Sequence, residues 1–540
     1  MNKLFERVLQ ARGIDKDFLE PKYENLTPPE NLPDMSKAIQ RLRQAKNNKE
    51  KVLIYGDYDV DGVTATTIIY DTLKLMGIAD IETMLPDRFL DGYGMSRRLV
   101  KNAIEKNINL VITVDCGSNN AEIIDELSEQ GIDTIVTDHH EFSGDIPERA
   151  VAVVNPKRPD FRVRNVDSGL SKLAGAGVAF NLALALANAK ELPEGQEKWL
   201  LDLAMIGTIC DSMELLEDNR IICHYGMIVL RKTRRPGLLE LMKAAGARKI
   251  DTDTIGFQIG PRLNAAGRME TAELALRLLM TNSKIEAVKL ANELNRLNLE
   301  RRKQQQEAVS EVEKKGLEDL PVIVVKGNWG EGVVGIIAGR LTEKYKRPSF
   351  VLTEVDGKLK GSGRSFGDFN LALALSECQN LLIAGGGHAA ACGLKLKSEN
   401  YEAFKQSIND YYNSLELKNQ ERFLDAKEDI DTDECGELNL ELASLLTKLE
   451  PFGEGNPAPV FLLKDMLVLN SDRIGSESQH LRMLIRGKDG KTLKCVAFNA
   501  PKEWLDLHSN ARINVWISLM ENEWNGTRSV EGRVIKLTYI

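Results

Sequence analysis

The chain has 540 residues and a formal net charge of −9 at pH 7, with 43% hydrophobic and 28% charged residues. This length predicts three or four domains, and the composition is typical of a soluble globular protein. No apolar run approaches the length that spans a bilayer, and the N-terminus lacks the apolar core of a secretory signal. The seven cysteines are scattered without CxxC spacing, which argues against a disulfide framework or zinc ribbon and predicts a cytoplasmic protein.

The negative charge is concentrated in one segment. Residues 401–450 hold 5 basic and 13 acidic residues, a net of −8, whereas residues 451–540 hold 12 basic and 10 acidic residues, a net of +2. The overall acidity therefore does not exclude a nucleic-acid partner, because basic grooves can form elsewhere. Composition alone demonstrates no such groove.

The first part of the chain has the pattern of an α/β protein. Residues 1–37 form a polar, proline-bearing lead-in with one short helix expected over 4–12. From residue 38 to about 215, short apolar runs alternate with helical stretches, of which 61–76 and 119–130 fit crossover helices. This alternation predicts a parallel sheet.

The first apolar run, Val52–Tyr55, is followed by Asp57, Asp59 and Asp61, and Gly62 closes the turn. If this stretch stayed extended, the alternate carboxylates would point to one side. Like charges crowded in this way need a compensating cation, and hard oxygen ligands favour Mg²⁺ or Mn²⁺. An acidic surface turn is the alternative interpretation.

Two later apolar runs also end in polar groups. One is followed by Asp115, and the other by Asp138, His139 and His140. Open parallel sheets place their ligand sites just past the carboxyl ends of the strands. An isolated histidine is more often structural, but two adjacent histidines beside an aspartate at such a strand end favour a metal site.

Residues 216–319 are mostly helical in pattern, and 283–315 contain neither Pro nor Gly, which predicts one long helix. We expect a solvated spacer between domains, with contact along a single stripe. The apolar positions that would form this stripe are Ile285, Val288, Ala291, Leu294 and Leu297.

A second α/β unit is expected over 320–412, an acidic linker over 413–450, and a small β-barrel over 451–540. The barrel is predicted from several short strands in fewer than 90 residues. These strands are 460–463, 466–469, 481–485, 493–498, 512–520 and 530–540.

The carboxylates and histidines resemble the motifs of the DHH phosphoesterase superfamily. Asp57–Gly62, Asp115 and Asp138–His140 resemble its first three motifs, and Asp211 resembles the fourth. Within this superfamily, the chain is similar to the RecJ single-strand-specific exonucleases. Further supporting segments occur in the family's order: Pro86–Gly94, Leu173–Phe180, Pro261–Arg268, Trp329–Ile336, Gly385–Ala391 and Leu449–Pro457.

The resemblance implies an architecture for each part of the chain. Residues 38–215 would form the parallel-sheet DHH catalytic domain, and 216–319 a helical region with the connector helix. Residues 320–412 resemble the companion DHHA1 domain, which binds substrate, and 451–540 would adopt an OB-like barrel that binds nucleic acid. No further docking domain is expected after the barrel.

The implied activity is 5′→3′ hydrolysis of single-stranded DNA with two divalent cations, Mn²⁺ or Mg²⁺, in DNA repair and recombination. By family position, Asp115 would bridge the two ions and Asp138 would orient His139. His140 would contact the scissile phosphate or protonate the leaving oxygen. The expected ligands are Asp57 and Asp59 for one ion and Asp61, His139 and Asp211 for the other.

The resemblance also implies how the substrate is bound. Arginine side chains can bind phosphate oxygens in a bidentate manner, and exposed aromatic side chains in the barrel can stack on bases. For Arg88, a surface salt bridge is an equal alternative. The expected substrate-binding residues are Arg88, Arg262, Asn264, Arg268, Arg364, Ser365, His388 and Trp524.

Two departures from the family pattern stand out. Gly330 occupies the position of a histidine in the usual Trp-His-Glu-Gly segment, so one substrate contact is expected to be missing. Cys210 precedes Asp211 where alanine is more usual, which leaves the ligand intact.

Single-stranded DNA is the expected partner, with a helicase or a single-strand-binding protein as a further candidate and no stable oligomer. Two alternatives for the function stay open. One is a DHH phosphodiesterase acting on oligoribonucleotides or cyclic dinucleotides, and the other is a non-catalytic replication scaffold that binds DNA or a helicase.

Overall fold

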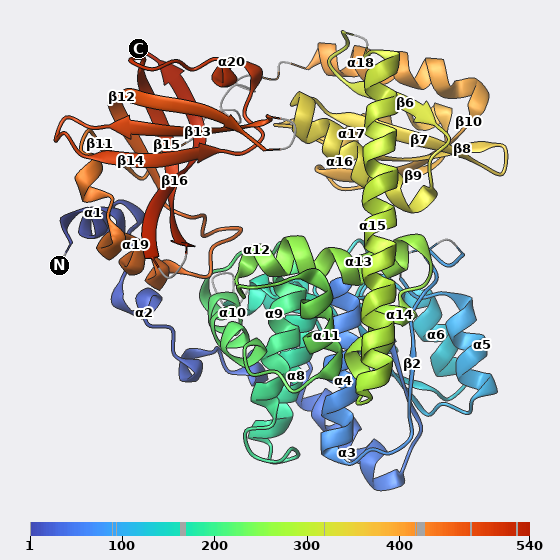
Figure 1. Ribbon diagram of the computed structural model, residues 1–540. Helices are drawn as coiled ribbons and strands as arrows, with labels where there is room; N and C mark the ends of the chain where they lie inside the picture. Colours follow the sequence, from blue (N-terminus) through green and yellow to red (C-terminus); the bar gives the residue numbers. More distant parts are fainter. Residues whose placement is uncertain are drawn as a thin grey trace.

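The computed structural model describes residues 2–88, 90–92, 94–162, 169–317, 319–415, 417, 427–475, 478–524 and 527–540. Within these residues the chain forms three β-sheets, each with its own helices (Figure 1). No described helix combines the length and the apolar character that crossing a membrane requires.

The first sheet is parallel throughout, with strand order β2-β1-β3-β4-β5. Every residue of β1 and β3 is buried, as expected for parallel strands covered on both faces. The sequence-based prediction of a parallel α/β domain is confirmed. The strands are β1 (Val52–Gly56), β2 (Ile81–Met84), β3 (Leu110–Val114), β4 (Asp133–Thr137) and β5 (Ala152–Val154).

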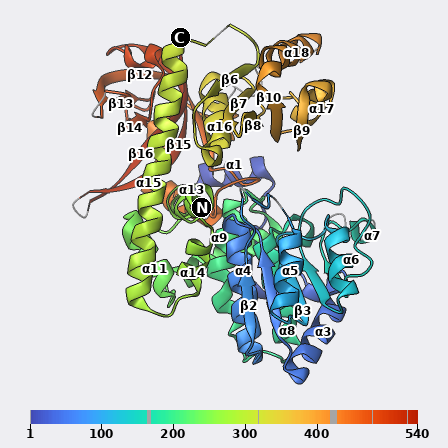
Figure 2. The ribbon, with the colours of Figure 1, turned by 90° about the vertical axis from the view of Figure 1, so that its right-hand side faces the viewer.

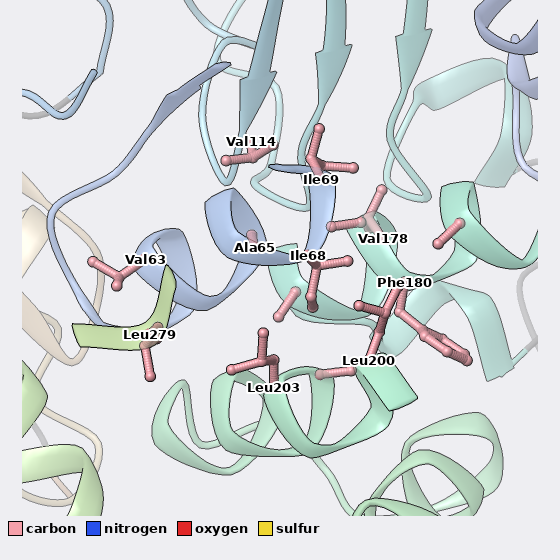
Figure 3. Packing of buried hydrophobic residues seen from close by; sticks show 14 of the residues in the cluster. Val63, Ala65, Ile68, Ile69, Val114, Val178, Phe180, Leu200, Leu203 and Leu279 are labelled. Carbon is pink, nitrogen blue, oxygen red and sulfur yellow. The ribbon is translucent and has the colours of Figure 1, made fainter. Parts of the chain in front are cut away.

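Helices cover both faces of this sheet and bury two separate apolar clusters. On one face, apolar side chains of the helices that follow β1 and β5 converge, as Figure 3 shows for Ile68, Val178, Phe180 and Leu203. On the other face, two shorter helices pack against the sheet through side chains that include Leu99 and Ile124. The helices are α3 (Met35–Asn48), α4 (Val60–Met76), α8 (Gly175–Asn188) and α9 (Leu201–Cys210) on the first face, and α5 (Arg97–Glu105) and α6 (Ala121–Glu129) on the second.

A helical region follows and ends in a long connector helix, α15, which runs from the first sheet domain to the second (Figures 1 and 2). This confirms the predicted connector. The elements are α10 (Glu217–Leu230), α11 (Pro236–Ala245), α12 (Thr252–Thr254), the π-helix η5 (Ile255–Ile259), α13 (Gly260–Met269), α14 (Glu273–Met280) and α15 (Lys284–Lys315).

The predicted contact stripe on α15 is wrong at its start. Ile285 and Val288 are 86% and 39% exposed, and Ala287 and Leu290 are buried in their place. The predicted positions Ile285, Val288 and Ala291 are spaced by three residues, which is shorter than a helical turn of 3.6 residues. Each step therefore rotates by about 60° around the helix, and the two positions before Ala291 lie outside the buried face. From Ala291 onward the predicted positions are buried against neighbouring helices.

The second sheet has the order β6-β7-β8-β10-β9, with β6 and β7 parallel and the other neighbours antiparallel. Its two faces bury separate clusters, one under α16 and one under α17 and α18. The elements are β6 (Ile323–Gly327), α16 (Val334–Tyr345), β7 (Ser349–Val355), β8 (Lys358–Arg364), α17 (Leu371–Glu377), β9 (Leu382–Gly387), β10 (Ala391–Lys397) and α18 (Tyr401–Ser414).

The third sheet is the predicted barrel, closed by pairing of β12 with β15. The two strands predicted over 460–463 and 466–469 form one strand, because the register shifts between Leu463 and Met466 and Asp465 has a φ of 56°. Such a bulge bends a strand without ending it. The strands are β11 (Ile430–Thr432), β12 (Val460–Ile474), β13 (His480–Arg486), β14 (Thr492–Ala497), β15 (Arg512–Trp524) and β16 (Thr527–Tyr539).

Two segments outside the expected barrel range pack into its core. Residues 430–449, which the sequence suggested as part of an acidic linker, form β11 and α19 (Leu440–Leu446) and bury Leu442 and Leu449. The N-terminal helix α1 (Lys3–Arg12) packs on the same core, and Arg12 pairs with Asp429 at 2.6 Å. The two ends of the chain therefore meet at the barrel.

A buried arginine joins the helical region to the segment that precedes the barrel and to the N-terminal segment. Arg220 of α10 donates hydrogen bonds to the carbonyl oxygens of Phe18 (3.0 Å), Leu449 (2.9 Å) and Lys448 (3.1 Å), and its guanidinium lies over the Phe18 ring. Burial lowers its pKa to about 10. The guanidinium thus satisfies main-chain acceptors from two segments that are distant in sequence.

We expect Arg220→Met to loosen this junction. Three carbonyl groups would lose their donor, at roughly 1–3 kcal/mol for each buried acceptor left unsatisfied. Amide hydrogen exchange of residues 448–456 should become about 100-fold faster, while strand β1 should keep its protection. Arg340→Met, at an exposed position where the arginine pairs with Glu343, is the control. Unchanged exchange at 448–456 in the Arg220 variant would show that the junction does not depend on this side chain.

Candidate metal centre and nucleic-acid site

The predicted carboxylates meet at one edge of the first sheet. Asp57 follows β1, Asp115 follows β3, and Asp138 follows β4. Because these strands are parallel, their carboxyl ends lie at the same edge. Asp211 arrives from the C-cap position of α9. Asp115 has a φ of 59°, a left-handed conformation that is uncommon for a residue other than glycine and is often found at functional sites.

The stretch from Asp57 to Asp61 is not one extended run, which corrects the sequence-based expectation. Helix α4 begins at Val60, and Asp59 is its N-cap, accepting a hydrogen bond from the Gly62 N–H at 3.0 Å. Asp61 therefore lies in the first helical turn. The three carboxylates are brought together by a strand end and a helix start, not by alternation along a strand.

The N-terminus of α8 and two glycines hold Asp61 and Asp115 in place. The Asp61 carboxylate accepts hydrogen bonds from the Gly175 N–H (2.6 Å) and the Ala176 N–H (2.9 Å). A Cβ at Gly175 would lie 2.6 Å from the Asp115 Cβ, and a Cβ at Gly207 would lie 2.5 Å from Oδ1 of Asp61. Both distances are too short for real atoms, so the site requires glycine at these positions.

The potential ligand atoms form three overlapping groups. In each group the ligand atoms lie within 4.8 Å of one another. Nε2 of His139 lies 3.1 Å from Oδ1 of Asp115. The same nitrogen lies 3.8 Å from Asp61 and 3.6 Å from Asp211. The groups are Asp57, Asp59 and Asp115; Asp61, His139 and Asp211; and Asp115, His139 and His140.

Without a cation, the crowding of the carboxyl groups disfavours their ionised form. Burial, followed by repulsion from Asp59, raises the pKa of Asp57 to about 8 and that of Asp211 to about 7. Among the described residues, Oδ1 of Asp57, Oδ1 of Asp115 and Nε2 of His139 are buried without a hydrogen-bond partner. Converging buried oxygen and imidazole atoms of this kind fit Mn²⁺ or Mg²⁺.

These pKa shifts predict a pH-dependent stabilisation by metal. Because the folded pKa values of Asp57 and Asp211 lie above the ordinary value of 3.8, their favourable contribution is complete below about pH 4 and is lost as the pH rises through 7 and 8. Bound Mn²⁺ compensates the charges that then form. The increase in Tm on adding Mn²⁺ should be small at pH 5.5 and reach about 5 °C at pH 8. Differential scanning fluorimetry measures it, and a shift that is equal at both pH values would contradict this prediction.

The side chain of Asp138 orients His140, not His139 as the sequence-based assignment had it. Its Oδ1 lies 2.8 Å from Nδ1 of His140, while His139 contacts it through the main-chain N–H. Although burial opposes both charges, this pairing raises the pKa of His140 to about 9 and lowers that of Asp138. Burial and the neighbouring His140 lower the pKa of His139 to about 3, which suits a neutral metal ligand.

Two residues that support this pair were missed from the sequence. Ser118 donates its N–H to Oδ2 of Asp138 at 2.9 Å. The Asn155 amide donates to the Ser118 hydroxyl oxygen at 2.7 Å and to the His140 carbonyl at 2.9 Å. Asn155 directly follows strand β5. Its place at a further strand end of the same sheet is the signal that could have identified it.

Four arginines gather beside the carboxylates. Burial, followed by repulsion from Arg88, Arg301 and Arg364, lowers the pKa of Arg268 to about 9. Arg88 lies over the ring of Tyr58 at 4.2 Å. Arg301, on α15, was not anticipated because it belongs to a helix that was expected to be only a spacer. Crowded guanidinium groups of this kind favour an anionic ligand.

The remaining predicted substrate residues lie in different surroundings. Arg262 donates to Asn295 at 3.0 Å and to the Gln258 carbonyl. The Ser365 hydroxyl donates to the Phe369 carbonyl. His388 is exposed in the turn between β9 and β10. The Trp524 side chain lies outside the described residues.

A cavity of about 410 Å³ lies next to Asp211, whose neighbours Cys210 and Ser212 line it, and several distant parts of the chain form its walls. Cys210, which precedes Asp211, lines it from α9, and Asn264 and Arg268 line it from α13. Arg301 of α15, Ile336 of α16 and the segment 452–454 before the barrel complete the walls. The predicted residues Asn264 and Arg268 therefore share one cavity with the end of α9.

Three family models match successive parts of the chain. The DHH family N-terminal domain matches residues 51–208, the DHHA1 domain 319–414, and the RecJ OB domain 432–536. The chain is 37% identical over 540 residues to the single-stranded-DNA-specific exonuclease RecJ of Bacillus subtilis, with 97% of this chain and 66% of that protein covered. It is 32% identical to the protein of the same name from Haemophilus influenzae, with 98% and 95% covered.

Solved structures give the same result. RecJ from Thermus thermophilus in complex with Mn²⁺ is similar with a TM-score of 0.83 and 31% identity, covering 99% of this chain and 75% of that one. The Mg²⁺ complex from the same organism gives 0.79 and 28%, with 99% and 74% covered. The fold, the order of the three domains and the full-length similarity together show that the chain belongs to the RecJ family of the DHH superfamily.

Proposed function

We propose that this chain is a metal-dependent exonuclease that hydrolyses the phosphodiester bonds of single-stranded DNA from the 5′ end. The observation that carries the proposal is the convergence of the ligand groups, in which Nε2 of His139 lies 3.1 Å from Oδ1 of Asp115. Arg268 and Arg301 line the cavity beside them. The names of the relatives supply the single-stranded DNA substrate. The family resemblance supplies the direction.

Two divalent cations, Mn²⁺ or Mg²⁺, fit the ligand groups. Asp57 and Asp59 would hold one ion, and Asp61, His139 and Asp211 the other, with Asp115 between them. When bound, the ions would supply an acidified water and neutralise charge on the phosphate. The rigid anchoring of Asp61 by two main-chain N–H groups supports a site that is formed before the substrate arrives.

His140 would donate a proton to the substrate, and the arginines would bind it. With a pKa of about 9, His140 carries a proton at neutral pH and can donate it to the leaving oxygen. Arg88, Arg268 and Arg364 would bind phosphate oxygens and hold the strand in position.

The direct test is a time course on DNA labelled at either end. Single-stranded DNA should lose a 5′ label at once, as mononucleotide, in Mn²⁺ or Mg²⁺, and not in EDTA. Double-stranded DNA and a dinucleotide should react much more slowly. Preferential cleavage of the dinucleotide would favour the phosphodiesterase alternative, and DNA binding without cleavage would favour a scaffold. A helicase or single-strand-binding protein as partner, the absence of a stable oligomer, and a cytoplasmic location stay predictions.

A further inference from the structure

An exposed aromatic side chain lies at the cavity beside the metal centre. Phe257 is 78% exposed, although its neighbours Ile255 and Ile259 in the π-helix η5 are buried. A π-helical turn is rare and is often found at functional sites. Phe257 lines the same cavity as Arg268 and Arg301. Water contact with a large aromatic ring is unfavourable, so the position calls for a ligand that covers the ring.

The cavity offers two kinds of contact. Phe257, Phe452 and Ile336 provide an apolar surface, and Arg268 and Arg301 provide positive charge. The carboxylates of the cavity, Asp253 and Glu454, come from other segments of its lining than the two arginines. Among the described residues, neither arginine forms an ion pair with a carboxylate: Arg268 approaches the Gly332 carbonyl at 3.4 Å, and Arg301 donates to the Asn298 side chain. A ligand with a flat apolar face and an attached anion would satisfy both surfaces. A nucleotide unit of a DNA strand has this chemistry.

The wall that carries Phe452 is fixed before any ligand binds. The Leu215 N–H donates to the Glu454 carbonyl at 2.8 Å. The buried Asn456 amide donates to the carbonyls of Leu449 (2.8 Å) and Pro451 (2.9 Å). This segment resembles a RecJ motif, and the chemistry assigned to the metal centre leaves it without a role. Its rigidity limits the entropy that binding would otherwise lose.

We propose that Phe257 is a stacking platform for one unpaired base of the DNA strand, with the adjoining phosphates on Arg268 and Arg301. This proposal rests on the proposed exonuclease function and deepens it. A base within a duplex has its faces covered by stacked neighbours, so a platform of this kind favours single strands. Phe257 is a specificity-determining residue in this assignment and takes no part in bond cleavage.

A double-mutant cycle, in which Phe257 and one base of the substrate are removed separately and together, tests the stacking contact. Oligonucleotides with one abasic site, moved stepwise from the 5′ end, are compared on the unaltered protein and on Phe257→Ala. The variant should raise KM about 10-fold, the effect of losing one base–aromatic stack, with kcat changed less than twofold. One abasic position should raise KM similarly on the unaltered protein and have no further effect on the variant. Equal abasic effects on both proteins at every position would overturn the proposal.

Two further variants and a second measurement separate the possible outcomes. Phe257→Trp should keep the KM and the abasic sensitivity, whereas Phe257→Leu should lose both, because an aliphatic side chain fills space but does not stack. Ile285→Ala, which removes an apolar side chain that is 86% exposed at the start of α15, is the control with no abasic pattern. The same cycle run as equilibrium binding in EDTA does not require hydrolysis. A stacking pattern there without any nuclease activity in Mn²⁺ would retain the platform and reject the proposed function.

Discussion

Asp115→Asn is expected to lower kcat on single-stranded DNA by at least about 10³-fold, because divalent ions supply several kcal/mol of stabilisation in the transition state. Asp115 belongs to two of the three ligand groups, and its Oδ1 is buried without a hydrogen-bond partner among the described residues. Asparagine keeps the shape and removes the charge. The substitution therefore weakens both proposed metal positions without leaving a hole.

Calorimetric titration with Mn²⁺ gives a readout that does not depend on turnover. The variant should bind fewer ions or bind them more weakly, while its affinity for DNA in EDTA should change little. Asp125→Asn, at a half-exposed position on α6, should behave as the unaltered protein. Full nuclease activity in Asp115→Asn would refute a mechanism in which this carboxylate joins two ions.

The strand ends of the metal centre could be predicted from sequence because the signal is local. An apolar run followed by Asp57 or Asp115 marks a buried strand and its carboxyl end, and parallel pairing then brings these ends to one edge. Asp211, at the end of a helix, was identified instead by its resemblance to the fourth family motif. The partner of Asp138 could not be found in this way. Two adjacent histidines are both within reach along the chain, and the turn after β4 decides which ring meets the carboxylate.

Features that depend on tertiary packing could not be predicted from the sequence pattern. Arg301 lies on a helix whose sequence has the composition of a solvated spacer, and only the folded chain brings it to Arg268. In the sequence, nothing distinguishes Arg220 from the other charged residues of α10. In the structure it is buried and donates to the carbonyl oxygens of Phe18 and Leu449, each more than 200 residues away. The acidic composition of 430–449 concealed an apolar face, with Leu442 and Leu449 in the barrel core.

Substituting glutamine for His139 or for His140 should produce two different defects, one in Mn²⁺ binding and one in kcat. His140→Gln is expected to reduce kcat by about 10²–10⁴-fold, the range for losing a positioned general acid. Mn²⁺ binding should change little. His139→Gln should instead weaken Mn²⁺ binding, because the His139 Nε2 lies among Asp61, Asp115 and Asp211. Calorimetry and single-turnover rates at saturating Mn²⁺ distinguish the two. Loss of Mn²⁺ binding in His140→Gln would make His140 a ligand, as its place in the third ligand group also permits.

The pH dependence of the hydrolysis rate tests whether His140 is the general acid. The folded pKa of His140, about 9, lies above its ordinary 6.5, so the ring stays protonated at neutral pH and loses its proton as the pH rises through 9. A general acid therefore predicts a rate that falls on the alkaline side. Asp138→Asn removes the charge that holds this proton, so the alkaline fall should move toward lower pH. Each added cation lowers the His140 pKa in both proteins, so the shift between them is the quantity to measure. An identical alkaline limb in Asp138→Asn would mean that the proton for the leaving oxygen comes from another group.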